Sequence, residues 1–172
     1  RLRESAAAWF EADAYARRSR DPWLQSLAGP KLAFALQQLG RLVEARTAGH
    51  EAEDLARSAR NRAALSLILA GQASLELACG NLDAAEARVR DALAACELTH
   101  DGWAFVMAHV VRVCVAVNRG RWDEVDAMFA ELMKADQRRI AGGFFGAVSA
   151  AALRLLAIAL RAPEAIDRGE LS

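Results

Sequence analysis

The sequence is poor in the residues that build disulfide frameworks, metal sites and membrane spans. Its 172 residues include three prolines, one tyrosine and three cysteines. The cysteines are odd in number and no two have C-x-x-C spacing, so we expect buried thiols in a reducing cytoplasm instead of disulfides or a zinc site. No apolar run reaches the roughly 18 residues that a membrane span needs. The chain begins with Arg1 and has no signal-peptide pattern, which indicates a cytoplasmic segment of a longer protein.

An excess of charge and the common catalytic motifs are also lacking. The 22 basic residues balance 22 acidic ones, so there is no basic surplus for phosphates and direct nucleic-acid binding is not expected. The sequence has no phosphate-binding G-x-x-x-x-G-K-[ST] loop, no G-x-S-x-G elbow and no H-E-x-x-H helix. No serine has a histidine at a spacing that would pair the two on one helix face. We therefore expect a chain that is not an enzyme and has no cofactor and no metal ligands.

The residues that are abundant favour helices. Alanine, leucine, arginine and glutamate recur throughout, and they lose little rotamer freedom in a helix. Apolar residues make up 54% of the chain, which is enough to build a core. The composition therefore predicts a single all-α domain.

The chain repeats every 40 residues. Gly40, Gly80 and Gly120 are each followed by a related string, such as Gly-Asn-Leu-Asp-Ala-Ala from Gly80. The same register finds similar strings near both ends of the chain. Repeats of this length are typical of helix pairs that bury their apolar faces by stacking. We divide the chain into units of about 1–20 (partial), 21–60, 61–100, 101–140 and 141–172 (partial).

Each unit is predicted to contain a helix A, a glycine turn and a helix B. Asp21, Asn61 and Asp101 occupy one repeat column and are favoured helix N-caps, whereas glycine is favoured just past a helix end. This predicts helices A at about 22–39, 62–79, 102–119 and 143–160, and helices B at about 2–18, 42–58, 82–98 and 122–138. The pair Gly29-Pro30 predicts a kink or a break in the first helix A. Small residues on one face of helix B, such as Ala85 and Ala92, should pack against helix A.

The second glycine string resembles the tetratricopeptide repeat. Gly80, Asp83, Ala85 and Ala92 take the places of that family's turn glycine, acidic residue and two alanines. The family's usual unit has about 34 residues, so the helices here are nearly a turn longer. Units of this length resemble the helical-repeat region of large ATP-binding LuxR-type bacterial transcription regulators. The resemblance implies a right-handed superhelical solenoid that binds a protein or an effector within a signal-responsive regulator.

A second function stays open at this point. Similar repeats occur in regulators with a bacterial transcriptional activator domain and in ATPase-linked cyclases. In such a protein the segment would be a structural spacer or a dimerisation surface with no ligand of its own. Its partners would then be the neighbouring domains of the parent chain or a second copy.

A polar stripe on helices A is the candidate groove. Helices A are expected to line the concave side of the solenoid, where repeat proteins usually bind. Gln72, Glu76, His109 and Arg112 fall on these helices, and we predict that all four point into one accessible groove holding a protein, a peptide or a small effector. The competing interpretation is a solvated face with salt bridges inside the stack.

Two tryptophans share a repeat column near the start of helix A. Trp23 and Trp103 lie two units apart. Aromatic residues dominate protein cores, which favours a packing role for both. If they are exposed instead, they would suit stacking on a sugar or a peptide.

Overall fold

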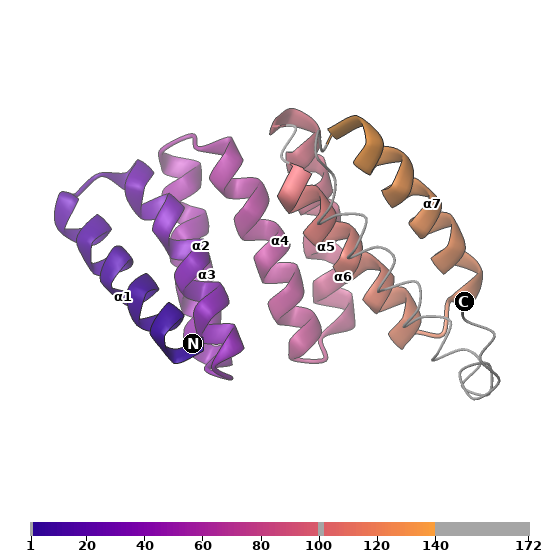
Figure 1. The fold of residues 1–172 in the computed structure, drawn as a ribbon, viewed down its shortest axis with the longest axis horizontal. Coiled ribbons are helices and arrows are strands. Elements are labelled where there is room, and N and C mark those ends of the chain that lie inside the picture. Colours follow the sequence, from indigo (N-terminus) through magenta and orange to yellow (C-terminus); the bar gives the residue numbers. More distant parts are fainter. Residues whose placement is uncertain (1, 100–101, 140–172) are drawn as a thin grey trace.

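The computed structural model describes residues 2–99 and 102–139 as seven α-helices, with no strand in these two ranges (Figure 1). All-α is therefore the correct fold class for the described part of the chain. The predicted helix ends agree with the observed ones to within about one residue, and the helix expected at 143–160 lies outside the described residues. The helices are α1 (Leu2–Ser19), α2 (Pro22–Gln38), α3 (Leu42–Ser58), α4 (Arg62–Ala78), α5 (Leu82–Thr99), α6 (Gly102–Asn118) and α7 (Trp122–Arg139).

The helices stand side by side in a row that runs from α1 to α7 (Figure 1). Short turns join α2 to α3, α4 to α5 and α6 to α7, so the helices of each pair run antiparallel. The first helix of one pair contacts the first helix of the next, α2 with α4 and α4 with α6, whereas α3, α5 and α7 make no such contacts with one another. We call the surface formed by α2, α4 and α6 the A face, and the surface formed by α1, α3, α5 and α7 the B face. Neighbouring helices therefore lie closer together on the A face.

Glycine ends the first helix of each pair. Gly40, Gly80 and Gly120 lie at the inter-helix turns with φ of 75°, 78° and 67°, which confirms the 40-residue register. At the second turn the Gly80 N–H donates to the Leu77 carbonyl oxygen at 3.0 Å, and the N–H of the next residue donates to the Glu76 carbonyl oxygen at 2.9 Å. This pair of bonds satisfies carbonyl groups that the helix end would otherwise leave free.

The glycine turn supplies the first testable prediction. We expect Gly80→Ala to lower the free energy of unfolding by about 1 kcal/mol, because a Cβ is disfavoured at this left-handed backbone conformation. No atom lies within 4 Å of where that Cβ would be, so the effect isolates backbone strain. Urea denaturation of both proteins measures it, and an unchanged midpoint would show that the turn does not hold this conformation in solution.

Side-chain caps begin two of the helices as predicted. The Asp21 carboxylate accepts the Trp23 backbone N–H at 2.8 Å, and the Asn61 side chain accepts the Ala64 backbone N–H at 3.1 Å. Asn61 also donates to the buried Ser26 hydroxyl at 3.0 Å, which ties the start of α4 to α2. The third predicted cap, Asp101, lies outside the described residues.

Helix α2 continues without a break through the Gly29-Pro30 pair, so the expectation of two short helices is wrong. Both residues are buried. A Cβ on Gly29 would lie only 2.6 Å from the Cβ of Ala52, so glycine allows α2 and α3 to approach very closely. We infer that this tight packing offsets the backbone hydrogen bond that Pro30 cannot make.

The core lies between the two helix layers. Ala85 and Ala92 of α5 are fully buried, as predicted. Ala85 packs in a cluster with Ala73 of α4 and Val111 of α6, and Ala92 packs in a second cluster with residues of the same two helices. Small side chains on α5 thus allow it to pack closely against α4 and α6.

Candidate binding surface

Two of the four predicted groove residues are buried. Gln72 is 7% exposed, and its side chain lies against α3, where a Cβ on Gly49 would be 3.4 Å from the Gln72 Cγ. His109 is 1% exposed, and its ring lies 4.3 Å from the ring of Phe105, centroid to centroid. The prediction that both side chains line an accessible groove is therefore wrong. Both side chains lie in the packed interior of the stack and not on the surface of the A face.

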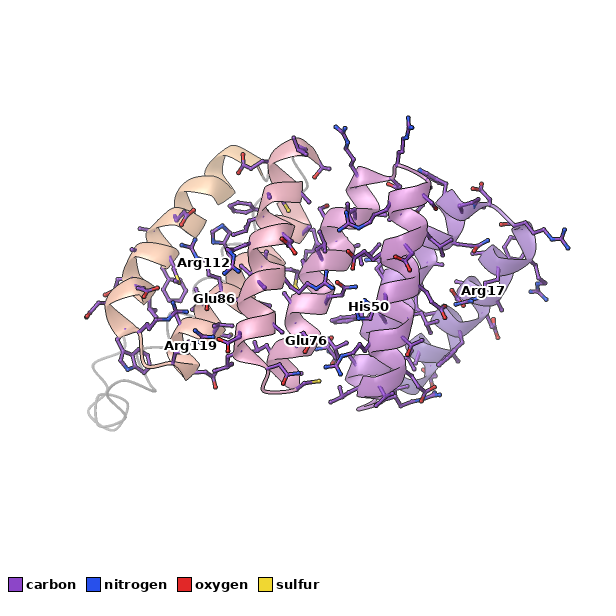
Figure 2. The ribbon with its side chains drawn as sticks, turned by 180° about the vertical axis from the view of Figure 1, so that it is seen from behind. Arg17, His50, Glu76, Glu86, Arg112 and Arg119 are labelled. Atoms are coloured by element: carbon purple, nitrogen blue, oxygen red, sulfur yellow. The ribbon has the colours of Figure 1, made fainter. Side chains whose placement is uncertain are left out.

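The other two predicted residues are engaged with different helices. Glu76 accepts two hydrogen bonds from the Arg46 guanidinium of α3, at 2.9 and 3.0 Å, and a third from the Asn81 amide at 2.7 Å. Arg112 instead pairs with Glu131 of α7, at 2.7 Å (Figure 2). Each side chain thus links neighbouring helices, and the structure does not gather the four predicted residues into one groove.

Glu53 is the centre of a largely buried polar cluster beside Gln72. Arg57 donates to this carboxylate at 2.7 Å and Arg88 of α5 does so at 3.1 Å. Burial alone would raise the pKa of Glu53. Hydrogen bonding from Arg57, the nearby Gln72 amide and the positive charges of Arg88 and Arg57 together outweigh burial and lower the pKa below its usual 4.5. Gln72 therefore belongs to a structural cluster that joins α3, α4 and α5.

The depressed pKa of Glu53 predicts acid sensitivity. The unfolded state binds a proton at Glu53 at higher pH than the folded state does, so this contribution to stability is complete above about pH 4.5 and is lost as pH falls through the folded pKa. We expect denaturant midpoints to fall over this acidic range, and Glu53→Gln to make the fall shallower. The comparison covers roughly pH 3 to pH 5, the range in which carboxyl groups titrate. If the denaturant midpoint falls equally steeply with pH in both proteins, this account is contradicted.

Ion pairs also link the helices of the B face to one another. Arg17 of α1 pairs with Glu51 of α3 at 2.7 Å. Arg88 of α5 pairs with Glu53 of α3 at 3.1 Å, and Arg121, just before α7, pairs with Glu86 of α5 at 3.0 Å. The partners lie 34 or 35 residues apart in each case, so each pair joins successive units, although the three pairs occupy different repeat columns (Figure 2). Much of the polar surface thus stabilises the stack.

Large apolar side chains are exposed on helices of both faces, and three aromatic ones belong to helices of the A face. Trp103 is 56% exposed, Trp23 is 50% exposed and Phe34 is 48% exposed. The packing role predicted for Trp23 and Trp103 is therefore wrong, and the alternative that both are exposed is correct. Single exposed apolar residues are ordinary, but a group of aromatic residues on one face calls for an explanation.

An open groove crosses the A face from α2 over α4 to α6. Its cavity volume is about 90 Å³. All three helices contribute to it, and the chemistry of the lining is apolar except for one cation. The lining residues of this A-face groove are Pro30, Lys31, Phe34, Leu67, Gly71, Trp103 and Met107.

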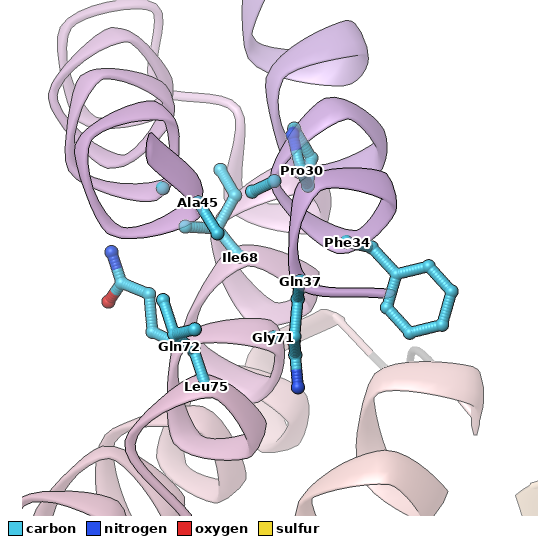
Figure 3. Close-up of a pocket in the computed structure, with 10 residues that line it drawn as sticks. Pro30, Phe34, Gln37, Ala45, Ile68, Gly71, Gln72 and Leu75 are labelled. Carbon is cyan, nitrogen blue, oxygen red and sulfur yellow. The ribbon is translucent and has the colours of Figure 1, made fainter. Parts of the chain in front are cut away.

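A second, inner cavity of about 20 Å³ lies between α2, α3 and α4 (Figure 3). It shares Pro30, Phe34 and Gly71 with the A-face groove and is also lined by Gln72. Figure 3 shows the Phe34 ring pointing away from the other side chains that line this inner cavity. The two spaces therefore meet where Phe34 of α2 faces Gly71 of α4.

Gly71 keeps the A-face groove open. It lies in the middle of α4, where glycine is about 1 kcal/mol less favourable than alanine. Nothing lies within 4 Å of the position that its Cβ would take, so neither a left-handed backbone nor close helix packing requires glycine there. The effect of glycine at this position is to leave room above α4.

Other kinds of site find no support among the described residues. In the two described ranges no three histidine, cysteine, aspartate or glutamate side chains are placed to hold a metal ion. None of the helices α1 to α7 is long and apolar enough to cross a membrane. Comparisons of the chain with models of protein families, with curated proteins and with solved structures find no match.

Proposed function

We propose that this chain is a non-catalytic binding segment of a bacterial signal-responsive transcription regulator, built as a right-handed tetratricopeptide-like solenoid. The 40-residue helix pairs and their glycine turns support the solenoid. The similarity of the repeat to those of LuxR-type regulators supports the regulatory role. In this proposal the ligand, a protein segment or a small effector, binds in the A-face groove.

The observation that carries the proposal is the groove itself. Side chains from three successive units converge on it, and two of them, Phe34 and Trp103, remain about half exposed to water. Exposing aromatic surface is unfavourable unless something covers it, and apolar pockets with few polar groups are typical ligand sites. Binding a ligand there would remove both side chains from water.

The runner-up is a spacer or dimerisation segment with no ligand of its own. Exposed aromatic residues would also suit contact with a second copy of the chain. In that case the A face would already be covered at the concentrations where the chain dimerises, and a small apolar probe would compete with dimer formation. The two functions are therefore separable by one binding experiment combined with sedimentation.

The experiment uses N-phenyl-1-naphthylamine, a neutral dye that fluoresces in apolar surroundings. We expect saturable one-site binding to the monomer, and loss of binding in Gly71→Leu, whose side chain would fill the groove without meeting the surrounding atoms at its Cβ. Leu98, an exposed residue of α5 on the other helix layer, supplies the matched control Leu98→Ala, which should bind normally. Binding that survives Gly71→Leu, or that appears only with dissociation of a dimer, would overturn the proposal.

A further inference from the structure

Lys31 is the one charged residue among the described residues that line the A-face groove. Five basic side chains are half-buried among the residues whose side chains the structure describes. The four arginines each hold a carboxylate: Arg46 pairs with Glu76, Arg88 with Glu53, Arg112 with Glu131, and Arg121 with Glu86. Lys31 alone has no carboxylate partner in the described part of the chain, although it lies at an apolar site where an unpaired charge is least favoured.

The surroundings of Lys31 define what would complement it. Phe34 and Trp103 present aromatic surface, and Met107 and Leu67 present flexible apolar surface. These groups suit an aromatic or aliphatic body, since aromatic rings stack and methionine adapts to irregular shapes. The three donors of the Lys31 ammonium suit an anionic oxygen.

The groove is small and carries a single cation among its described lining residues. Its cavity volume is about 90 Å³, and one cation balances one negative charge, which favours a small ligand with a single charge. The open space above Gly71 lies in the same repeat column as Lys31, one unit on, so the ligand body would lie over α4 while its charged end faces α2.

We propose that the A-face groove binds a small hydrophobic monoanion, with its apolar body against Trp103 and Phe34 and its carboxylate or similar anionic group held by Lys31. This rests on the proposed function, because it names the ligand class of the same groove. The ammonium group and the anion form a charge-assisted hydrogen bond that also neutralises the unpaired charge of the free protein.

The test compares 4-phenylbutyrate with 4-phenyl-1-butanol as competitors of the neutral dye. The two compounds share the apolar body and differ in the charged end. We expect the carboxylate to bind about fivefold more tightly at low salt, as befits an ion pair that is partly open to solvent. In Lys31→Met this preference should disappear while the dye still binds, since methionine keeps the apolar stem.

The control is Arg62→Gln, which removes one positive charge from an exposed position on α4 outside the groove. It should keep the preference for the carboxylate. Equal affinity of the two competitors, or a preference that survives Lys31→Met, would overturn the assignment of a monoanion while leaving the groove intact as a binding site. Failure of the dye itself to bind would instead refute the proposed function.

Discussion

Replacing Gly29 with alanine should lower the free energy of unfolding by about 1–3 kcal/mol, the usual cost of overpacking a well-packed core. Alanine is the better helix former, so propensity alone predicts the opposite sign. The packing decides, because the new Cβ would lie 2.6 Å from the Cβ of Ala52 on α3. Urea denaturation monitored by far-UV circular dichroism measures the difference.

Two companion variants separate packing from helix propensity. Gly71→Ala makes the same change in the middle of α4, where no atom is close, and should raise stability by about 1 kcal/mol. Adding Ala52→Gly to Gly29→Ala removes the opposing Cβ and should recover most of the loss. A stabilising effect of Gly29→Ala would contradict the close contact between α2 and α3.

Replacing Ala92 with leucine should also overpack the core and lower the free energy of unfolding by about 1–3 kcal/mol. Ala92 is fully buried in the cluster that joins α5 to α4 and α6. Three extra carbon atoms there force the helices apart or push neighbouring side chains out of their preferred rotamers. The expected result is a clearly lower melting temperature.

The matched control is Ala94→Leu, two residues further along α5 and exposed. It makes the same chemical change without overpacking. Surface substitutions of this kind usually change the free energy of unfolding by less than about 0.5 kcal/mol. Equal melting temperatures for Ala92→Leu and the wild type would mean that this face of α5 is not the packed one.

The positions of the helices could be predicted from sequence because their ends depend on local chemistry. Gly80 adopts a left-handed conformation that other residues avoid, and Asn61 caps the backbone three residues ahead of it. Both effects depend only on residues within about one helical turn. The same residue types recur every 40 residues, so the same helix ends are expected in each unit. At Gly29-Pro30 the alternative of two short helices is wrong, since α2 is continuous there, and the close approach of Gly29 to Ala52 of α3 involves a residue far away in the sequence.

The binding surface was harder to predict, because a repeat shows which positions are equivalent without showing which way they face. Consecutive helix residues point about 100° apart, so Gln72 lies against α3 while its neighbour Gly71 opens onto the A face. Polar side chains were a poor guide, because Glu76 pairs with Arg46 of the preceding helix, α3. Lys31, which lines the A-face groove, lies in the same repeat column as Gly71.

The most direct test of the A-face groove is a titration of the chain with 4-phenylbutyrate followed by NMR of the tryptophan indole N–H signals. The four tryptophans report on different places: Trp103 lines the groove, Trp23 lies at the start of α2 outside the groove lining, and Trp9 and Trp122 lie on helices of the B face. We predict that the Trp103 signal shifts most and that Gly71→Leu abolishes the shift. Two results would contradict binding in the A-face groove: shifts confined to Trp9 or Trp122, or no shift at millimolar ligand. Half-saturation at millimolar ligand corresponds to a binding free energy of about 4 kcal/mol.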